Sequence, residues 1–277
     1  MKEQGNDLQG LREYMEGVMS RRPTLDFSRV DDDRLLRDFR QTRTFDQILW
    51  AITTGQRIAA NLVLITGQNG GGKTTALKLF AATTHQAVYF EARAGYEPRH
   101  LLTDVIRALP VATGEGWRLQ TSAAVAYLRE HPHVFLIDEA QRLNYACLDL
   151  LKYLADNSGS TCVLSASSSL AVRIERWPDI ASRCPVRLEV QPITLEEFVE
   201  LWQVDGWSLE VLQEIHRVSK GVMRTIRYVL VMLEDSLQGD DFHSAVPRNA
   251  VTSSHVRAVA QSVVPSNAPG TDLARPA

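Results

Sequence analysis

The chain has 277 residues, 44% hydrophobic and 23% charged, enough for one large domain or for a main domain with a small second one. Its formal net charge of −3 gives no general attraction to nucleic acid, so any DNA site would be a local basic patch. No apolar run is long enough to span a bilayer, and the first residues lack the apolar core of a signal peptide. The three cysteines are far apart, which argues against a metal site and predicts reduced thiols in the cytoplasm.

The first 40 residues are expected to be an extension that precedes the main domain. Residues Asp7–Met19 predict a short amphipathic helix, because their apolar side chains recur at helical spacing: Leu8, Leu11, Tyr14, Met15 and Val18. The strongly charged stretch Val30–Phe39 predicts a surface segment. A helix is then predicted over Thr44–Gln56, with Thr42 or Thr44 as its cap.

The strongest motif of the chain lies in residues 61–75. The apolar run Leu62–Ile65 predicts a buried parallel strand, and Ala76–Ala82 predicts a helix. Between them the sequence matches G-x-x-x-x-G-K-[ST] at every fixed position, which argues against a glycine-rich turn that binds nothing. Glycines let backbone N–H groups curl around phosphates, and the helix adds the positive end of its dipole. We therefore expect ATP at Gly67, Gln68, Asn69, Gly70, Gly71, Gly72, Lys73, Thr74 and Thr75.

Two of these residues have further roles in such a loop. Lys73 can reach the β- and γ-phosphates, and the hydroxyl of Thr74 can bind Mg²⁺.

Strand and helix patterns alternate through the rest of the main domain. Four further strands are predicted: Ala87–Phe90, Val134–Ile137, Thr161–Ser165 and Pro185–Val190. Helices are predicted over Pro98–Leu109, Thr121–Glu130, residues 148–154 and Thr194–Trp202. This alternation predicts an α/β fold of the P-loop NTPase kind, with a five-stranded parallel sheet covered by helices.

An acidic pair, Asp138 and Glu139, follows the predicted strand Val134–Ile137. Ligands of open α/β sheets bind at this end of the strands, so Asp138 is expected to hold Mg²⁺ and Glu139 to deprotonate the attacking water. Acids that favour a helix N-terminus are the alternative, which the upstream P-loop makes less attractive. Near the end of the next strand, Ser165 or Ser167 could contact the γ-phosphate or the water, or cap a helix.

The main domain is predicted to end at Asp205-Gly206. The expected divisions are an extension (1–40), a nucleotide-binding domain (41–205), a helical lid (206–260) and a disordered tail (261–277). The lid contains two predicted amphipathic helices, Ser208–Val218 and Met223–Leu237.

These features together resemble an AAA+ ATPase over roughly Thr44–Leu237. The stretch IDEAQRL (Ile137–Leu143) and the short lid resemble the DNA-transposition ATPases of the phage Mu B and TnsC type. Secretion ATPases of the ExeA type share the DEAQ stretch. The resemblance implies a homo-oligomer, a ring or a helical filament, that binds duplex DNA without sequence preference and acts on a transposase. An AAA+ ATPase that acts on protein partners without DNA is the alternative, and a nucleotide-gated scaffold with little hydrolysis is a third.

The resemblance also implies roles for several arginines. Arg183, just before the predicted fifth strand, resembles an arginine finger that completes the ATP site of a neighbouring subunit, and Arg173 and Arg176 compete for this role. Arg224 resembles the lid arginine known as sensor 2, which binds the nucleotide.

A basic stretch in the lid is the candidate DNA site. No acid lies between His216 and Arg227, and we expect Arg217, Lys220 and Arg227 to contact phosphates. A solvated helix face explains the same pattern.

Overall fold

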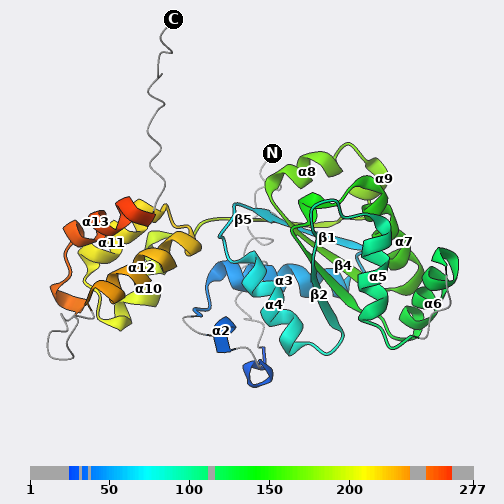
Figure 1. Cartoon of the computed structure of the whole chain (residues 1–277), viewed down its shortest axis with the longest axis horizontal. Helices are drawn as coiled ribbons and strands as arrows, with labels where there is room; N and C mark the ends of the chain where they lie inside the picture. Colours follow the sequence, from blue (N-terminus) through cyan, green and yellow to red (C-terminus); the bar gives the residue numbers. More distant parts are fainter. Residues whose placement is uncertain (1–24, 31–32, 37–38, 112–115, 238–247, 264–277) are drawn as a thin grey trace, which may run out of the picture. The chain divides into compact units, whose positions relative to one another are not determined.

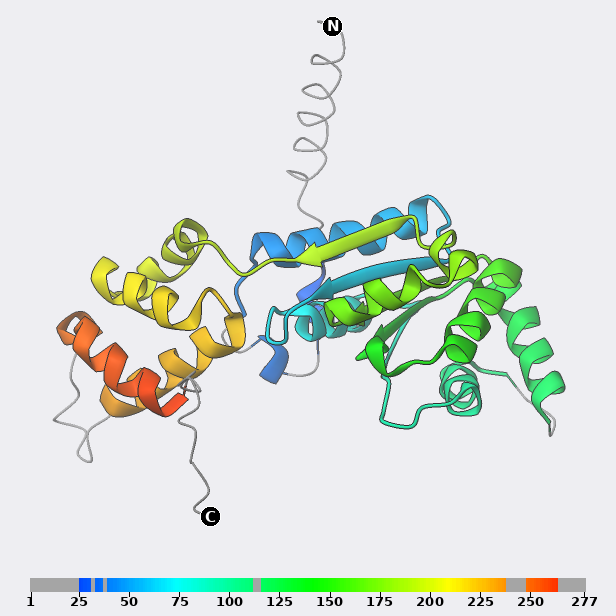
Figure 2. The same ribbon diagram turned by 90° about the horizontal axis from the view of Figure 1, so that it is seen from above.

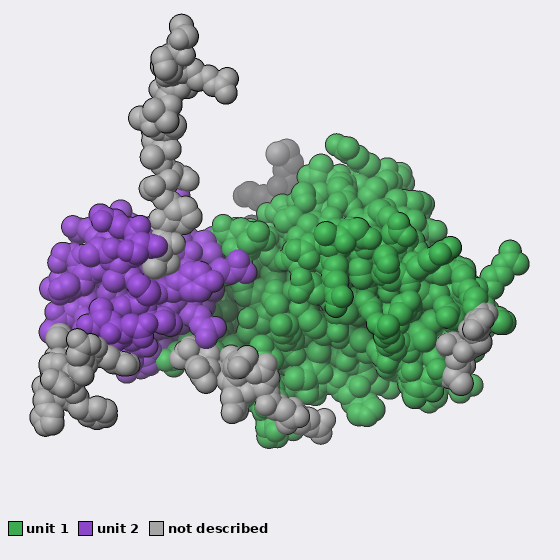
Figure 3. Space-filling model, viewed as in Figure 1, with its two compact units in different colours: residues 1–191 green, residues 192–277 purple. Residues whose placement is uncertain are grey.

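The structure is a computed structural model that describes residues 25–30, 33–36, 39–111, 116–237 and 248–263. The chain divides into two compact units, residues 1–191 and 192–277 (Figure 3). This division places helix α10 (Leu195–Trp202) in the second unit, whereas a boundary at Asp205-Gly206 would leave it in the first. The helix predicted over Asp7–Met19 lies outside the described residues.

Unit 1 is built on a five-stranded parallel sheet, which confirms the predicted fold class. Its strands are β1 (Leu62–Gly67), β2 (Ala87–Glu91), β3 (Val134–Asp138), β4 (Thr161–Ala166) and β5 (Val186–Val190), in the order β2-β3-β4-β1-β5. All neighbouring strands are parallel. In Figure 2 the arrows of β1 (cyan) and β5 (yellow-green) point in the same direction. Because β4 lies between β1 and β3, the carboxyl ends of these three strands meet at one edge of the sheet.

Helices cover both faces of this sheet (Figure 1). One face packs against α3 (Arg43–Arg57) and α4 (Lys73–Thr83). The other face packs against α5 (Pro98–Arg107), α6 (Trp117–Glu130), α7 (Tyr145–Ser158), α8 (Ser168–Ile174) and α9 (Pro178–Ala181). Strand β1 shows the two-residue period that this arrangement needs: Leu62 and Leu64 belong to the α5–α9 core, and Val63 and Ile65 to the α3–α4 core.

The prediction of a surface segment over residues 30–39 was wrong for its described part. This part contains a short helix, α2 (Asp33–Leu36), after a 3₁₀ turn, η1 (Phe27–Arg29). Val30 is 8% exposed, and Leu36 and Phe39 pack against the α3–α4 core. The charged residues of this segment dominate its sequence pattern, but its apolar side chains lie on one side and pack against the core.

Two of the predicted helix starts are settled by hydrogen bonds. Thr42 caps α3, because its hydroxyl accepts from the amide of Phe45 at 3.2 Å. Helix α6 begins at Trp117, four residues before the predicted start at Thr121, and the hydroxyl of Thr121 donates back to the Trp117 carbonyl at 2.8 Å.

Unit 2 is helical, with its own apolar core. It contains α10, η3 (Gln203–Asp205), α11 (Leu209–Ser219), α12 (Met223–Leu237), η4 (Arg248–Ala250) and α13 (Ser253–Val263). Both predicted lid helices are present, but α13 was not predicted. Its residues 261–263 correct the first part of the predicted disordered tail, and residues 264–277 lie outside the described residues. Among the described residues, no helix is long and apolar enough to cross a membrane.

Candidate active site

The loop between β1 and α4 has a backbone that requires glycine. Gly67, Gly70 and Gly72 have φ angles of 146°, 85° and 90°, in the region that side chains disfavour. A Cβ on Gly67 would lie 2.7 Å from the carbonyl oxygen of Val190 in β5, whereas a Cβ on Gly72 would meet nothing within 4 Å. The first turn of α4 has no side-chain cap, so its N–H groups stay available to an anion.

Lys73, the first residue of α4, folds back over this loop. Its side chain is buried, and its Nζ donates to the carbonyls of Gly67 at 2.8 Å and Gln68 at 3.0 Å. The ammonium group therefore lies against the loop that is expected to hold the phosphates.

Asp138 at the end of β3 is the best-anchored acid of the site. Its Oδ2 accepts from the hydroxyls of Thr74 at 2.6 Å and Tyr89 at 3.3 Å. Its Oδ1 accepts from the hydroxyl of Ser165 at 2.8 Å and from the amide of Glu139 at 2.9 Å. Burial and the Asp138 carboxylate raise the pKa of Tyr89, which keeps that hydroxyl protonated and able to donate.

The donors at this point fit a magnesium ion bound together with a nucleotide. The Thr74 hydroxyl and the Asp138 carboxylate are hard oxygen ligands that already lie in contact. Among the described residues, no group of three or more histidine, cysteine or acidic side chains could hold a metal alone. Two protein oxygens suit Mg²⁺, which keeps several waters and takes phosphate oxygens as further ligands.

Glu139 has a left-handed backbone, with φ of 53°, which is uncommon for a residue with a side chain and recurs at functional sites. Its Oε2 accepts from the amide nitrogen of Gln141 at 2.8 Å and pairs with Arg142 at 3.2 Å. Arg142 in turn donates to the carbonyl of Ala92 at 2.8 Å and pairs with Glu91. The carboxylate is thus held at the tip of β3.

Gln141 also joins the ends of two strands. Its Oε1 accepts from the backbone amide of Ser167, just after β4, at 3.2 Å. Tyr89, Gln141 and Arg142 were not among the residues predicted for this site. Gln141 and Arg142 follow the acidic pair directly, which is a local signal, but Tyr89 is placed beside Asp138 only by the pairing of β2 with β3.

The two candidate serines after β4 differ in their contacts. Ser165 is fully buried, and its hydroxyl donates a hydrogen bond to Asp138. The hydroxyl of Ser167 bonds that of Ser169 at 2.8 Å, and Ser167 makes no side-chain cap for α8. Ser165 is therefore placed to orient Asp138, and a contact with the γ-phosphate stays a prediction for either serine.

The candidate finger Arg183 lies far from the P-loop of its own chain. Its carbonyl accepts from the amide of Leu62, at the beginning of β1, whereas the P-loop follows the end of this strand. Its Nε pairs with Asp156 at 3.0 Å. Arg183 therefore cannot contact a nucleotide held by the same chain.

The competing arginines are placed differently. Arg173 donates to the carbonyls of Gln141, at 2.7 Å, and Leu143, and its guanidinium lies over the ring of Trp177. These bonds give Arg173 a role in holding the segment after Glu139, whereas the side chain of Arg176 is exposed.

The four basic residues of unit 2 that are expected to contact DNA or the nucleotide are all exposed: Arg217, Lys220, Arg224 and Arg227. Arg217 also binds the buried carboxylate of Glu214 through two hydrogen bonds, of 2.8 and 2.7 Å. The expected contacts of Arg217, Lys220 and Arg227 with DNA, and of Arg224 with the nucleotide, stay predictions.

Residues 56–174, from the end of α3 to the end of α8, match the protein family described as an AAA domain. The fold of the chain resembles that of the Aeropyrum pernix ORC2 protein in ADPNP–ADP complexes, with a TM-score of 0.60 and 16% identity over 85% of this chain and 72% of that chain. A comparison with curated proteins finds no match.

Two further solved structures show the same likeness. The Cdc6p protein of Pyrobaculum aerophilum has a TM-score of 0.62 and 18% identity, over 84% of this chain and 71% of its own. The Aeropyrum pernix ORC1 protein in complex with DNA has a TM-score of 0.58 and 17% identity, over 83% of this chain and 68% of its own. At these identities the likeness establishes the AAA+ fold, and finer functions remain proposals.

Proposed function

We propose that the chain binds ATP with Mg²⁺ at the P-loop and hydrolyses it. The observation that carries this proposal is the contact between Thr74 and Asp138, which lies beside a glycine loop and next to Glu139. A metal ligand pair, a phosphate cradle and an adjacent base are the parts that water attack on a γ-phosphate requires.

Each residue has a distinct part in this reaction. Lys73 exchanges its two bonds with loop carbonyls for bonds to the β- and γ-phosphates, where it stabilises developing charge. The first N–H groups of α4 bind phosphate oxygens. A Glu139 carboxylate oxygen accepts the proton of the attacking water. When bound, Mg²⁺ would be held by Thr74 and Asp138 and would offset phosphate charge.

We further propose that Arg183 acts on the nucleotide of a neighbouring copy. Its place at the opposite end of β1 from the P-loop leaves it no contact with the nucleotide of its own chain, where it pairs with Asp156. Such a residue can change turnover by ~10³–10⁵ in nucleotide hydrolases, so hydrolysis would depend on assembly.

The finer function that we favour is a homo-oligomeric, DNA-binding regulator of a transposase. Three observations support it: the resemblance of IDEAQRL (Ile137–Leu143) with the short lid to transposition ATPases, the exposed Lys220, Arg224 and Arg227 in unit 2, and the likeness in fold to a protein solved in complex with DNA. Repeated copies would add sequence-independent phosphate contacts along a duplex.

A protein-directed ATPase is the second candidate, and one feature of α12 favours it. Tyr228, Val231 and Met232 are 52%, 40% and 43% exposed, and their spacing puts them on one face of the helix. An exposed apolar stripe of this kind suits a protein partner better than a phosphate backbone.

The rate of ATP hydrolysis with and without non-specific duplex DNA, at low and moderate salt, separates the two candidates. The DNA-binding hypothesis predicts that DNA raises the rate of hydrolysis and that this effect becomes smaller as the salt concentration rises, because phosphate contacts release counterions. A Lys220→Ala, Arg227→Ala variant should lose the stimulation and keep its basal rate. Arg257→Ala is the matched control, since Arg257 is bound to Glu214. If DNA does not change the hydrolysis rate of the parent protein at either salt concentration, the DNA-binding hypothesis is contradicted and the protein-directed ATPase is favoured.

A further inference from the structure

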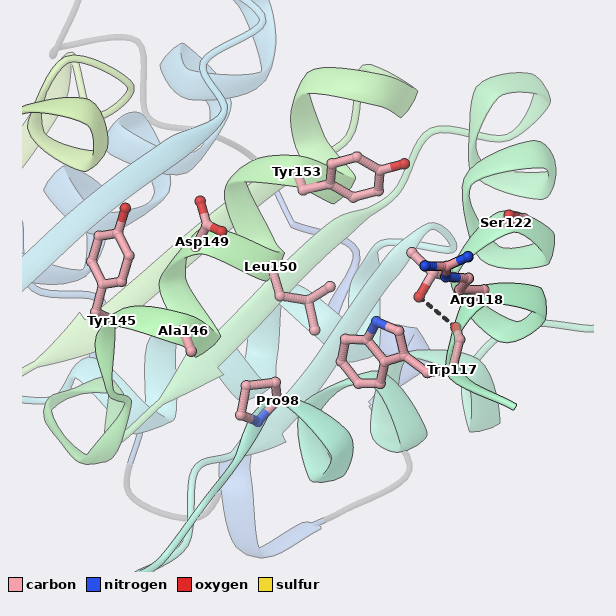
Figure 4. Close-up of a pocket in the computed structure, with 10 residues that line it drawn as sticks. Pro98, Trp117, Arg118, Ser122, Tyr145, Ala146, Asp149, Leu150 and Tyr153 are labelled. Carbon is pink, nitrogen blue, oxygen red and sulfur yellow. Dashed lines mark hydrogen bonds between the residues drawn. The ribbon is translucent and has the colours of Figure 1, made fainter. Parts of the chain in front are cut away.

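An open groove of about 580 Å³ lies on the α5–α7 side of unit 1 (Figure 4). Trp117 and Arg118 contribute one wall from α6, and Tyr145, Asp149 and Tyr153 contribute the other from α7. Figure 4 shows Leu150 of α7 between the rings of Trp117 and Tyr153. None of these residues belongs to the candidate active site.

The groove leaves large apolar side chains in water. Trp117, Tyr145 and Tyr153 are 40%, 41% and 48% exposed, and Leu119, in the same turn of α6 as Trp117, is 61% exposed. Tryptophan and tyrosine supply much of the binding energy at protein interfaces. The groove therefore has the composition and the shape that receive an amphipathic helix.

The segment Asp7–Met19 has the pattern of such a helix. At helical spacing, Leu8, Leu11, Met15 and Val18 share one face. Arg12 and Asp7 fall on opposite flanks of this face. If the helix lies in the groove, Arg12 can therefore contact one wall and Asp7 the other.

The walls of the groove carry the complementary charges. Arg118 on the α6 wall is exposed, and Asp149 on the α7 wall is half exposed although it also pairs with Lys152 at 2.7 Å. Arg12 would face Asp149, and Asp7 would face Arg118.

The groove cannot receive this segment from its own chain. Leu25 and Phe27 pack against the α3–α4 core, on the opposite face of the sheet from the groove. The residues between Met19 and Leu25 span at most about 20 Å when extended. A sheet with a helix layer on each face is about 30 Å thick, and the chain would have to pass around its edge.

We propose that residues 7–19 of one copy form an amphipathic helix that docks in the α5–α7 groove of a second copy. The donor segment and the receiving groove are different surfaces, so each copy can give one helix and accept another. Contacts of this head-to-tail kind build rings or open filaments. The interface deepens the homo-oligomer part of the proposed function, but it requires neither ATP nor hydrolysis.

Cysteine cross-linking between two differently tagged variants of the full chain tests this contact. The native thiols do not interfere, because Cys147, Cys162 and Cys184 are buried, and burial raises the pKa of Cys162 to about 12 and that of Cys184 to about 11. One variant carries Tyr14→Cys, on the same flank of the helix as Asp7, and the other carries Ser122→Cys, an exposed groove residue of the α6 wall. The matched control replaces Ser122→Cys by Ser254→Cys, an exposed serine of α13.

We expect on the order of tenfold more mixed disulfide with Ser122→Cys than with Ser254→Cys, because docking gives the two thiols a high effective concentration. Trp117→Ala should lower this yield about tenfold, since a central aromatic anchor is removed. Equal yields at the two positions would overturn the proposal. No mixed disulfide without nucleotide would also overturn it, because the proposed contact needs none.

A charge exchange supplies a second, independent test. Arg12→Asp alone and Asp149→Arg alone should each weaken self-association in sedimentation, and both changes in one chain should restore it. Turnover is not part of either measurement, so an inactive ATPase would refute the proposed hydrolysis and leave this interface standing. Failure of the double variant to associate better than either single variant would refute the pairing.

Discussion

Asp138 is held by donors from four separate parts of the chain. They are the hydroxyls of Thr74, Tyr89 and Ser165 and the backbone amide of Glu139. A carboxylate bound on both oxygens loses its rotational freedom before any ligand arrives. Such preorganisation lowers the cost of placing a metal and a water correctly.

Ser165 and Ser167 provide a matched pair for testing this arrangement. Ser165→Ala removes one of the bonds to Asp138 and should raise the Mg²⁺ concentration for half-maximal ATP turnover by about tenfold. Ser167→Ala should leave this concentration unchanged, because that hydroxyl bonds Ser169. A Mg²⁺ titration of turnover in both variants makes the comparison, and a larger effect of Ser167→Ala would contradict the assignment.

For single residues, the sequence motifs identify the side chains of the site, and the pairing of the strands determines which other side chains contact them. Lys73, Thr74, Asp138 and Glu139 stand out because two fixed motifs follow two apolar strands. The choice between Ser165 and Ser167 depends on where β4 ends, because Ser165 lies within β4 and Ser167 follows it, and a serine-rich strand end leaves that open. Tyr89 is apolar in pattern, and only its place across from β3 shows its bond to Asp138.

At the scale of the element, the turn from β1 into α4 depends on close packing against β5. Gly67 lies where a side chain would both collide with Val190 and force a left-handed backbone, whereas Gly72 has only the second problem. The P-loop is thus shaped by the sheet as well as by its own sequence.

We expect Gly67→Ala to lower the free energy of unfolding by about 2 kcal/mol or more and to weaken ATP binding. Gly72→Ala should cost only about 1 kcal/mol, because the space around it is open. Urea unfolding and nucleotide titration of both variants test the difference. Equal losses of stability in the two variants would show that Val190 moves aside for the new methyl group with no loss of folding free energy.

In unit 2, one buried acid ties two helices together. Glu214 of α11 accepts hydrogen bonds from Arg217 on its own helix and from Arg257 on α13, which lower its pKa from 4.5 to about 2. A lowered pKa in the folded state stabilises the fold above the ordinary pKa. This stabilisation is lost as pH falls from about 4.5 towards 2.

Glu214→Gln should therefore lower the stability of unit 2 by about 1 kcal/mol at neutral pH, since both arginines are largely exposed. The difference from the parent should vanish near pH 2. Glu210→Gln, an exposed position on the same helix, serves as the control. Unfolding curves across this pH range provide the measurement, and a difference that persists in acid would contradict the role of the ion pairs.

The elements that the sequence did not predict share a physical cause. The described part of residues 30–39 and α13 bury only a few apolar side chains among many polar ones, for example Val30, Val256 and Ala260. Their order comes from packing on helices that precede or follow them. The five strands were predictable because parallel strands buried on both faces are apolar along their length.

In the whole molecule, the two compact units would take part in two proposed kinds of contact between copies. Unit 1 carries the P-loop and the acidic residues, and in the proposed assembly Arg183 would act at the site of another copy. The proposed docking of residues 7–19 in the α5–α7 groove would join copies without a nucleotide. Assembly and hydrolysis are therefore expected to be coupled, although each can be measured without the other.

We propose above all that Glu139 activates water at an ATP site formed by the P-loop and Asp138. The most direct test compares ATP binding and steady-state hydrolysis in the parent and in Glu139→Gln, which keeps the shape of the side chain but cannot accept the proton. We predict near-parental ATP affinity and a turnover lower by about 10²–10⁴-fold. An unchanged turnover, with affinity retained, would contradict the assignment of Glu139 and favour a scaffold that binds ATP without this chemistry.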